Sequence, residues 1–256
     1  MINKDFEKWA KGYSGFDGGN PNAKIWLCGI EWGGNQTENL EDLQKDFQND
    51  VSKIPMGYDN HNENLDFPYN YKFLKVMAAA KGIDFLANGS DSKKIKQILK
   101  DFNDKEKHFT KESNYLKLNI FPLQFQEDKN SLWTKVYKDA TGFETKNEYR
   151  KWCLEKGRFE LFQNMIRESA PSLIITTGST SRNYYIEAFG FKDFELQSRN
   201  LKYDTTKNIY YAYDYDKDIM FLNIPFLGRP LNSNKILMEV GELIANDLIF
   251  KYDLKV

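Results

Sequence analysis

The sequence predicts an α/β protein, a three-layer α/β/α sandwich around a central, mainly parallel sheet of four strands. The first observation is a set of short apolar runs at 25–29, 172–178 and 220–224. Such runs are typical of parallel strands that are buried on both faces. The second observation is that segments with helical spacing of their apolar residues separate these runs. Because strands that alternate with helices usually pair in parallel, the two observations together indicate one sheet with helices on its faces.

The first strand leads into the most unusual loop of the chain. Residues 24–34 read KIWLCGIEWGG, in which the apolar run breaks into a glycine-rich segment that contains Glu31 and Trp32. Ligands of open α/β sheets bind at the carboxyl ends of the strands, where this loop is expected. The segment therefore predicts a binding or catalytic loop. A tight turn with a solvated glutamate is the alternative for a glycine cluster of this kind.

The other elements are predicted from apolar periodicity and from turn residues. Leu116, Leu118 and Ile120 alternate with polar residues, so a second strand brings Asn119 to its carboxyl end and stops at Pro122. The tyrosine-rich sequence within 191–218 predicts an antiparallel hairpin at the sheet edge, and residues 12–23 predict a loop. Helical spacing and capping residues predict helices at 5–11, 39–53, 71–82, 92–102, 147–169 with a division at Gly157, and from 232 or 233 onward.

Composition limits the classes of protein to be considered. The 256 residues contain no flexible linker, so one domain is expected over 1–256, with polar insertions near 57–70 and 127–146. The net charge of −1 excludes a globally basic nucleic-acid binder but allows a local basic groove. Two histidines and two cysteines at scattered positions form no usual ligand set, so no metal or other cofactor is expected. Without a signal peptide or membrane-spanning stretch, we expect a cytoplasmic monomer that has no membrane partner.

Four segments at predicted strand ends share their order and spacing with a known family. They are GIEWGG at 29–34, LNIFPL at 118–123, APSLIITTG at 170–178 and NIPFLGRPLNSN at 223–234. Together they resemble the uracil-DNA glycosylase superfamily over most of the chain. The first loop is most similar to the GINPG loop of the mismatch-specific branch, with Trp32 in place of proline. The resemblance implies one domain with the fold of that superfamily and DNA as its partner.

The resemblance also implies roles for individual residues. Glu31 lies at the position that activates water, Asn119 at the position that reads the edge of an extruded base, and Asn223 in the loop that contacts the leaving base. The family most often has histidine in that loop, but the two histidines here are His61 and His108, so a neutral hydrogen bond would replace the imidazole. The candidates are Glu31 and Asn223 for catalysis, Trp32, Asn119, Phe67 and Tyr69 for base binding, and Gly33, Gly34, Ser179, Arg182 and Arg229 for DNA binding.

Several of these residues also have a purely structural interpretation. Phe67 and Tyr69 belong to a long polar segment and either stack on a base or anchor that segment to the core. Asn119 at a strand end also suits a turn. Arg182, near a helix start, and Arg229, in a loop, either bind phosphate or are solvated.

These residue types fit hydrolysis of an N-glycosidic bond. The reaction passes through an oxocarbenium-like state, in which a carboxylate stabilises positive charge and orients water. The leading hypothesis is therefore a DNA glycosylase that excises a damaged, mismatched or modified base after flipping it out of the stack. One alternative is a non-catalytic nucleic-acid or nucleotide binding module on the same fold. Another is a hydrolase of free nucleotides or nucleosides, which suits the pI of about 6.2.

Overall fold

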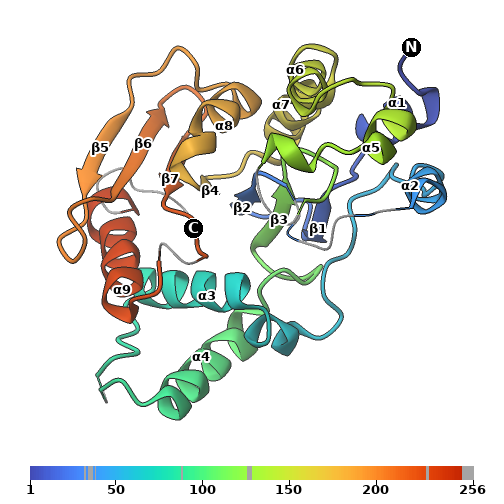
Figure 1. Ribbon diagram of the computed structural model, residues 1–256. Helices are drawn as coiled ribbons and strands as arrows, with labels where there is room; N and C mark the ends of the chain where they lie inside the picture. The colour runs from blue at the N-terminus through green and yellow to red at the C-terminus, as the bar shows by residue number, and fades with distance from the viewer. Residues whose placement is uncertain are drawn as a thin grey trace.

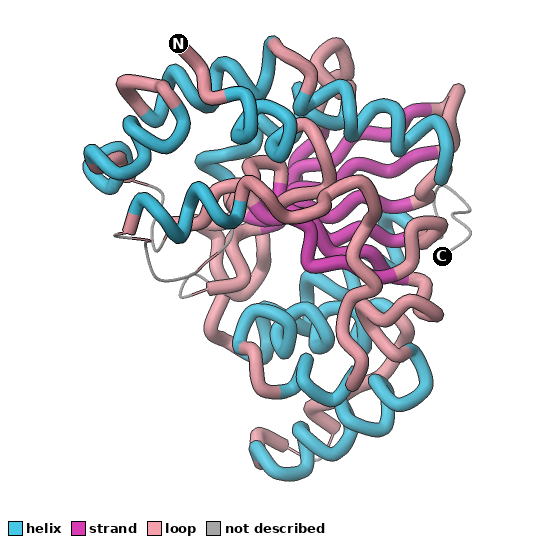
Figure 2. The backbone as a smooth tube through the Cα atoms, turned by 90° about the vertical axis from the view of Figure 1, so that its right-hand side faces the viewer, coloured by secondary structure: helices cyan, strands magenta, loops and turns pink. Residues whose placement is uncertain are grey.

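A computed structural model describes residues 1–31, 33, 37, 39–87, 89–125, 129–228 and 231–249. For residues 247–249 it describes the backbone only. Within these residues, a seven-stranded sheet has the strand order β1-β3-β2-β4-β7-β6-β5 (Figure 1). Helices lie on both of its faces (Figure 2), so the predicted α/β class is confirmed. The strands are β1 Phe16–Gly19, β2 Ile25–Gly29, β3 Tyr115–Asn119, β4 Leu173–Thr177, β5 Gln197–Asn200, β6 Asn208–Asp214 and β7 Ile219–Ile224.

The four strands predicted for the centre of the sheet are parallel neighbours in the structure. β2 pairs with β3 on one side and with β4 on the other, and β4 pairs with β7. The sheet is wider than the four strands expected, because antiparallel strands extend it at both ends in the described part of the chain. At one end, β6 and β5 continue the sheet beyond β7, within the segment 191–218 for which an edge hairpin is predicted.

β1 lies in the segment 12–23, for which the sequence predicts a loop. Its sequence FDGG has little strand propensity, yet it pairs with β3. Gly19 has a φ of +125°, and a Cβ atom at this residue would lie 2.4 Å from the carbonyl oxygen of Tyr115. The strand therefore depends on a close approach of two backbones, which apolar periodicity does not reveal.

Two groups of helices cover the sheet. One face carries α3 Pro68–Ala80, α4 Ser92–Glu106 and α9 Asn234–Leu243. The other carries α1 Lys4–Ala10, α2 Leu40–Asp46, α5 Lys135–Thr141, α6 Lys146–Glu155, α7 Arg158–Ser169 and α8 Arg182–Phe189. Shorter turns are η1 His61–Leu65, η2 Asn130–Leu132, η3 Ser179–Ser181 and the π-helical η4 Ile244–Ile249. The break between α6 and α7 confirms the division of the helical segment 147–169.

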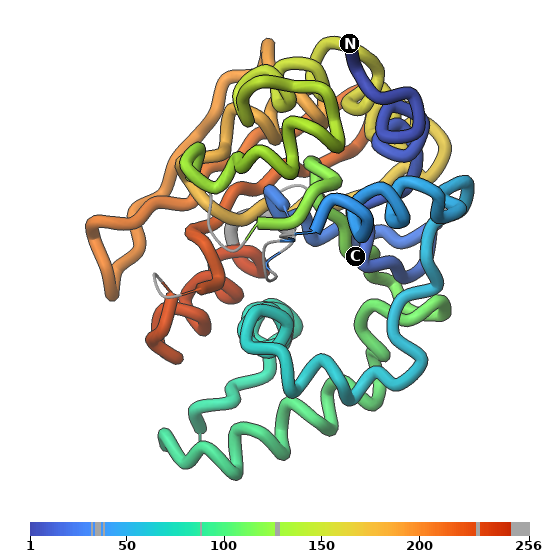
Figure 3. Tube along the Cα trace, turned by 45° about the vertical axis from the view of Figure 1, so that its right-hand side comes forward, coloured from blue at the N-terminus to red at the C-terminus, as the bar shows by residue number. Residues whose placement is uncertain are grey.

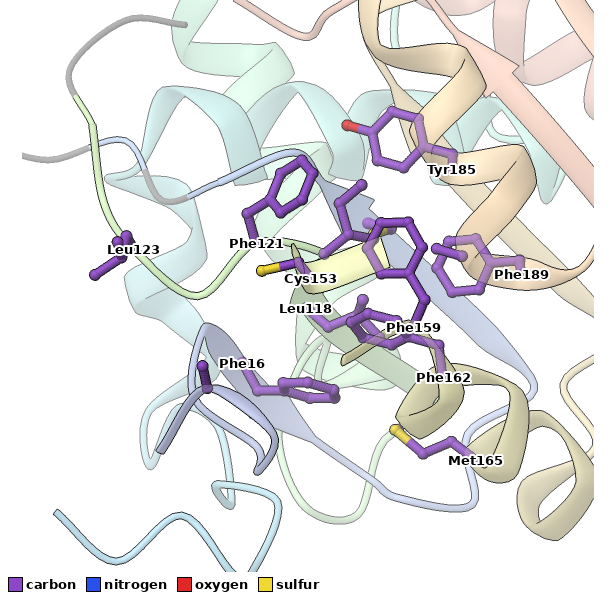
Figure 4. Close-up of a cluster of buried hydrophobic side chains, with 14 of the residues drawn as sticks. Phe16, Leu118, Phe121, Leu123, Cys153, Phe159, Phe162, Met165, Tyr185 and Phe189 are labelled. Atoms are coloured by element: carbon purple, nitrogen blue, oxygen red, sulfur yellow. The ribbon is translucent and has the colours of Figure 1, made fainter. Parts of the chain in front are cut away.

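The core beneath α7 and α8 is rich in aromatic side chains. Phe121, Phe159, Phe162 and Phe189 are buried there (Figure 4). The ring centroid of Phe162 lies 6.2 Å from that of Phe159 and 5.7 Å from that of Phe189. Such aromatic pairs contribute about 0.5–1.5 kcal/mol each beyond the burial of their surface. Packing therefore accounts for part of the high aromatic content of the chain.

The path of the chain reverses direction at the centre of the sheet. From β2 it passes α2 on one face and then α3 and α4 on the other before entering β3 (Figure 3). From β3 it passes α5, α6 and α7 on the face of α2 before entering β4. Because β3 and β4 lie on opposite sides of β2, the connections diverge at the carboxyl ends of the central strands. Such a switch point is where ligands of open α/β sheets bind.

Arg158, the first residue of α7, joins the N-terminal segment to the end of β3. Its side chain is buried, and burial lowers its pKa to about 10, which leaves it charged at neutral pH. The guanidinium donates hydrogen bonds to the backbone carbonyl oxygens of Ala10, Gly12, Ser14, Asn119 and Ile120. One side chain thus satisfies acceptors from two distant segments.

Replacement of Arg158 by methionine removes the donors for these carbonyl groups and leaves the groups buried. We expect Arg158→Met to lower the free energy of unfolding by about 3–5 kcal/mol, measured by urea denaturation followed by circular dichroism. Arg167→Met, at an exposed position of the same helix, is the matched control and should change it by less than about 0.5 kcal/mol. Equal effects of the two substitutions would show that the hydrogen bonds of Arg158 do not hold the N-terminal segment.

Candidate functional site at the carboxyl edge

The parallel strands β2, β3, β4 and β7 end side by side. Their ends and the loops that follow them form the carboxyl edge of the sheet. In the strand register, Gly29 lies beside Asn119, and Thr177 lies beside Ile224. Most of the predicted site residues lie in or next to the segments that follow. Gly33 is exposed, whereas Trp32, Gly34 and Arg229 lie outside the described residues.

Glu31, two residues after β2, is buried in an ion cluster. One carboxylate oxygen lies 2.8 Å from Lys146 Nζ and the other lies 3.2 Å from Arg150 Nη2. The side chains of Glu31, Lys146 and Arg150 are 3%, 0% and 7% exposed. Both cations reach the same carboxylate because residues four apart lie on one face of α6. Each oxygen of the Glu31 carboxylate therefore bonds to a different cation of this cluster.

Aromatic rings enclose the two cations of the cluster. Lys146 Nζ lies 3.8 Å from the ring centroid of Phe125. The Arg150 guanidinium lies 5.1 Å from the centroid of Phe121 and 5.5 Å from that of Tyr184. Because these rings exclude water, the attraction between the charges is stronger than it would be at the surface. The cluster therefore stabilises the ionised form of Glu31 and holds the start of the loop after β2 against α6.

The partners of Glu31 were not predicted, although the sequence contains a signal for them. Lys146, Tyr149, Arg150 and Cys153 follow the i, i+3, i+4, i+7 spacing of one helical face, and all four are buried. Two cations on a buried face need a buried acid. This requirement points to Glu31, an acid that directly follows a buried strand.

The two predicted asparagines lie on opposite faces of the sheet. Asn119 has the same strand parity as Tyr115, which belongs to the core under α3. Asn223 has the parity of Phe221, which belongs to the core under α8. Glu31, through its contacts with α6, lies on the same side as Asn223. The structure therefore does not bring the three polar candidates to one point.

Each asparagine has its own set of local contacts. Asn119 Nδ2 donates a hydrogen bond of 3.0 Å to the Gly15 carbonyl oxygen. Its Oδ1 would lie 2.3 Å from a Cβ atom at residue 29, so only glycine fits there. Asn223 Nδ2 donates to Thr176 Oγ1 at 2.9 Å, whereas its buried Oδ1 has no hydrogen-bond partner within the described residues. Asn223 thus has a buried acceptor available at the end of β7.

Tyr69 and Phe226 form an aromatic surface on the α3 side of the carboxyl edge. The ring centroids of the two lie 5.9 Å apart, and Phe226, in the loop after β7, is 46% exposed. Tyr69 Oη and Thr177 Oγ1 share a hydrogen bond of 2.8 Å, which fixes the start of α3 to the end of β4. Lys117 Nζ lies 5.5 Å from the Tyr69 ring centroid. Burial raises the pKa of Tyr69, so its phenol is neutral.

The other predicted residues lie around this surface and along the edge. Phe67, which precedes α3, is 48% exposed and has its ring centroid 6.0 Å from that of Tyr58. Ser179 is exposed in the turn after β4. The guanidinium of Arg182 lies 3.8 Å from the ring centroid of Tyr210 in β6. Phe226 was not among the predicted residues, although an aromatic residue in the loop after a buried strand is the signal for it.

The described residues present few other reactive groups. They contain no group of three or more His, Cys, Asp or Glu residues that could hold a metal ion. Cys28 and Cys153 are free and buried, and burial raises the pKa of both thiols. Neither thiol is therefore an activated nucleophile at neutral pH.

Comparisons with protein-family models, with curated proteins and with solved structures find no match for this chain. In the part of the chain that the structure describes, no helix is both long and apolar enough to cross a membrane. Function is therefore argued from the residues of the carboxyl edge.

Neutralising Glu31 removes a carboxylate charge that bonds to two buried cations. We expect Glu31→Gln to lower the free energy of unfolding by about 3–5 kcal/mol in urea denaturation. The double variant Glu31→Gln/Lys146→Met, which removes one cation together with the acid, should recover part of this loss. Glu155→Gln, at the exposed end of the same helix, is the control, with an expected change below about 1 kcal/mol. A Glu31→Gln protein as stable as this control would show that the cluster is not required for the fold.

Proposed function

We propose that this chain is a DNA glycosylase that hydrolyses the N-glycosidic bond of a flipped-out damaged, mismatched or modified base at the carboxyl edge. The observation that carries the proposal is the position of Glu31. Its carboxylate is held by two cations just after β2, one of the two inner strands of the four parallel strands. The switch point at this strand supports a ligand site there. The order of the four strand-end motifs supports this class of reaction. In this proposal the protein acts on DNA as a cytoplasmic monomer.

Glu31 has the chemistry that the reaction needs. As the bond to the base breaks, positive charge develops on the sugar, and a carboxylate stabilises this charge and orients the attacking water. The base departs with negative charge, for which the family most often supplies a histidine. Lys146 and Arg150 place two positively charged groups beside Glu31, and positive charge at this position favours the departure of an anionic base.

The aromatic surface and the two asparagines have complementary roles in this proposal. Leaving the stack costs a base a few kcal/mol, and stacking on Tyr69 and Phe226 offsets part of this cost. The unpartnered Asn223 Oδ1 is an acceptor for a water or for an N–H group of the base. Asn119, which is bonded to the backbone, contributes by holding the ends of β2 and β3 in place.

A non-catalytic binding module is the second candidate, and one observation favours it. Both carboxylate oxygens of Glu31 bond to cations, and the side chain is 3% exposed. In this reading, the cluster stabilises the loop after β2, and the half-exposed aromatic residues bind a base without cleaving its bond. The two candidates differ in whether base is released.

The deciding experiment measures base release from oligonucleotides that carry uracil, mismatches, oxidised bases or hypermodified pyrimidines, in the presence of a chelator. We expect release by the wild type and a rate at least about 100-fold lower for Glu31→Gln, because a buried charge that stabilises the transition state is lost. Glu31→Gln/Lys146→Met separates lost chemistry from lost stability, and Glu155→Gln is the matched control. Release by folded Glu31→Gln at the wild-type rate would contradict the role of Glu31.

Other outcomes of the same experiment select between the alternatives. Salt-dependent binding of oligonucleotides by folded protein without release from any of them would favour the binding module. Release from free nucleosides, with none from oligonucleotides, would favour a hydrolase of small substrates.

A further inference from the structure

Two lysines of α3 lie next to the loop between β7 and α9 and have no carboxylate partner in the part of the chain that the structure describes. Lys72 Nζ donates hydrogen bonds to the Gly228 carbonyl oxygen at 2.5 Å and to Asn232 Oδ1 at 2.7 Å. Lys75 Nζ donates to Asn234 Oδ1 at 2.7 Å. Lys75 is a buried residue, with 8% of its surface exposed. Within the described residues, neither lysine forms a salt bridge, which is unusual for a buried cation.

The first turn of α9 adds positive charge to the same place. A helix N-terminus carries partial positive charge, which proteins usually balance with acidic residues. The first turn of α9 has no acidic residue and contains Lys235, and the Ser233 side chain does not cap the helix. Asn234, the first residue of α9, is the partner of Lys75. Two lysines and an uncapped helix start therefore face one another with only neutral oxygens between them.

This crowding of positive charge is unfavourable without an anion. Burial and the nearby charge of Lys72 lower the pKa of Lys75 to about 8, and burial lowers that of Lys72. A hollow of about 380 Å³ opens beside the first turn of α9, and it meets the lysines only through Asn234, the acceptor of Lys75. Its lining consists of Leu86, Gly89, Ser90, Ser233, Asn234 and Lys235.

We propose that Lys72, Lys75 and the first turn of α9 bind one backbone phosphate of a nucleic-acid strand. Such a phosphate exchanges the neutral acceptors Asn232 and Asn234 for charged oxygens and accepts hydrogen bonds from the backbone N–H groups at the start of the helix. This inference rests on the proposed function insofar as it names a nucleic-acid strand as the ligand.

The position of the lysines relative to the aromatic surface favours a strand over a free anion. Tyr69 and Lys72 are three residues apart on α3, which places them on one face about 4.5 Å apart along the helix axis. Phe226, which packs on Tyr69, and Gly228, which bonds to Lys72, lie in the same loop. A base stacked on the aromatic surface therefore has its own phosphate within reach of Lys72. The reach from a base to its own phosphate therefore suits the separation between the aromatic surface and Lys72.

The test measures binding of a fluorescein-labelled single-stranded 12-mer by anisotropy at several salt concentrations. Lys72→Gln and Lys75→Met should each weaken binding several-fold, alike for all sequences, and reduce the slope of log affinity against log salt by about 0.7. Lys75→Met keeps the apolar stem and removes only the buried charge, so the variant should remain folded. Lys94→Gln, an exposed lysine of α4, is the control and should leave the slope unchanged.

Binding should also depend on pH, with a predictable sign. The groups that act on the Lys75 amine from α3 are Lys72 and Tyr71. On α9, Lys235 follows the Lys75 partner Asn234 and faces the Tyr203 ring, and the buried Glu239 accepts hydrogen bonds from the backbone of Lys202 and Tyr203. Phosphate binds the protonated amine, so wild-type affinity should fall as pH rises through about 8. Lys75→Arg stays charged and should keep its affinity at pH 9. An identical pH profile for wild type and Lys75→Arg would overturn the role of Lys75.

Further outcomes separate this site from the glycosylase proposal. Lysine-dependent binding of the 12-mer by a protein that releases no base would support the phosphate site and contradict the glycosylase. Wild-type salt slopes in Lys72→Gln and Lys75→Met, or no binding of the 12-mer at all, would overturn the phosphate site. Lysine-dependent binding of inorganic phosphate, with unchanged 12-mer affinity in both variants, would overturn the assignment to a strand.

Discussion

Burial of the parallel sheet on both faces is the constraint on which the rest of this structure depends. β4 and β7 are buried along their whole length, and β2 is buried up to its last residue. Polar groups in such a layer carry a large desolvation cost unless they are paired, so they concentrate where the strands end. Residues far apart in sequence, such as Glu31, Asn119 and Asn223, therefore reach the same edge of the sheet.

The same cost explains why Glu31 has two cationic partners. A buried carboxylate is costly unless it is paired, and here each of its oxygens bonds to a different cation, which fixes the carboxylate at the end of β2. Under the proposed function, the cations serve the leaving base, and the carboxylate serves the sugar. Opposite charges that develop at the two ends of one breaking bond thus find opposite charges in one cluster.

The parallel strands were predictable because their apolar runs express a local requirement, burial on both faces. β1 was not predictable from apolar periodicity, because its FDGG sequence suits the close approach of Gly19 to β3. This contact joins residues that are about 95 positions apart in the chain. Glu31 was predictable from its loop, but Lys146 and Arg150 lie 115 and 119 residues away. Their pairing becomes visible only when α6 is recognised as having cations on its buried face.

Lys75 is an exception to the usual exposure of lysine side chains on helices. Lysines on helices are usually solvated, but α3 is buried from Phe73 through Ala80, which leaves Lys75 no solvent face. The residues around Lys75 in this part of α3 are apolar on every side of the helix. A lysine among them is therefore expected to be buried. The identity of its acceptor depends on where α9 begins, which is a tertiary feature.

The distribution of charge reconciles the net charge of −1 with the proposed nucleic-acid ligand. Lys146 and Arg150 lie on the α6 side of the carboxyl edge, and Lys72 and Lys75 lie on the opposite side, between α3 and α9. Because the screening length is about 8 Å at physiological salt, a strand at this edge responds to these clusters and not to the distant acids that cancel them in the total. A protein with no overall positive charge can therefore hold a phosphate strand at one edge of its sheet, provided that cations such as Lys72 and Lys75 there are bonded to neutral oxygens within the described residues.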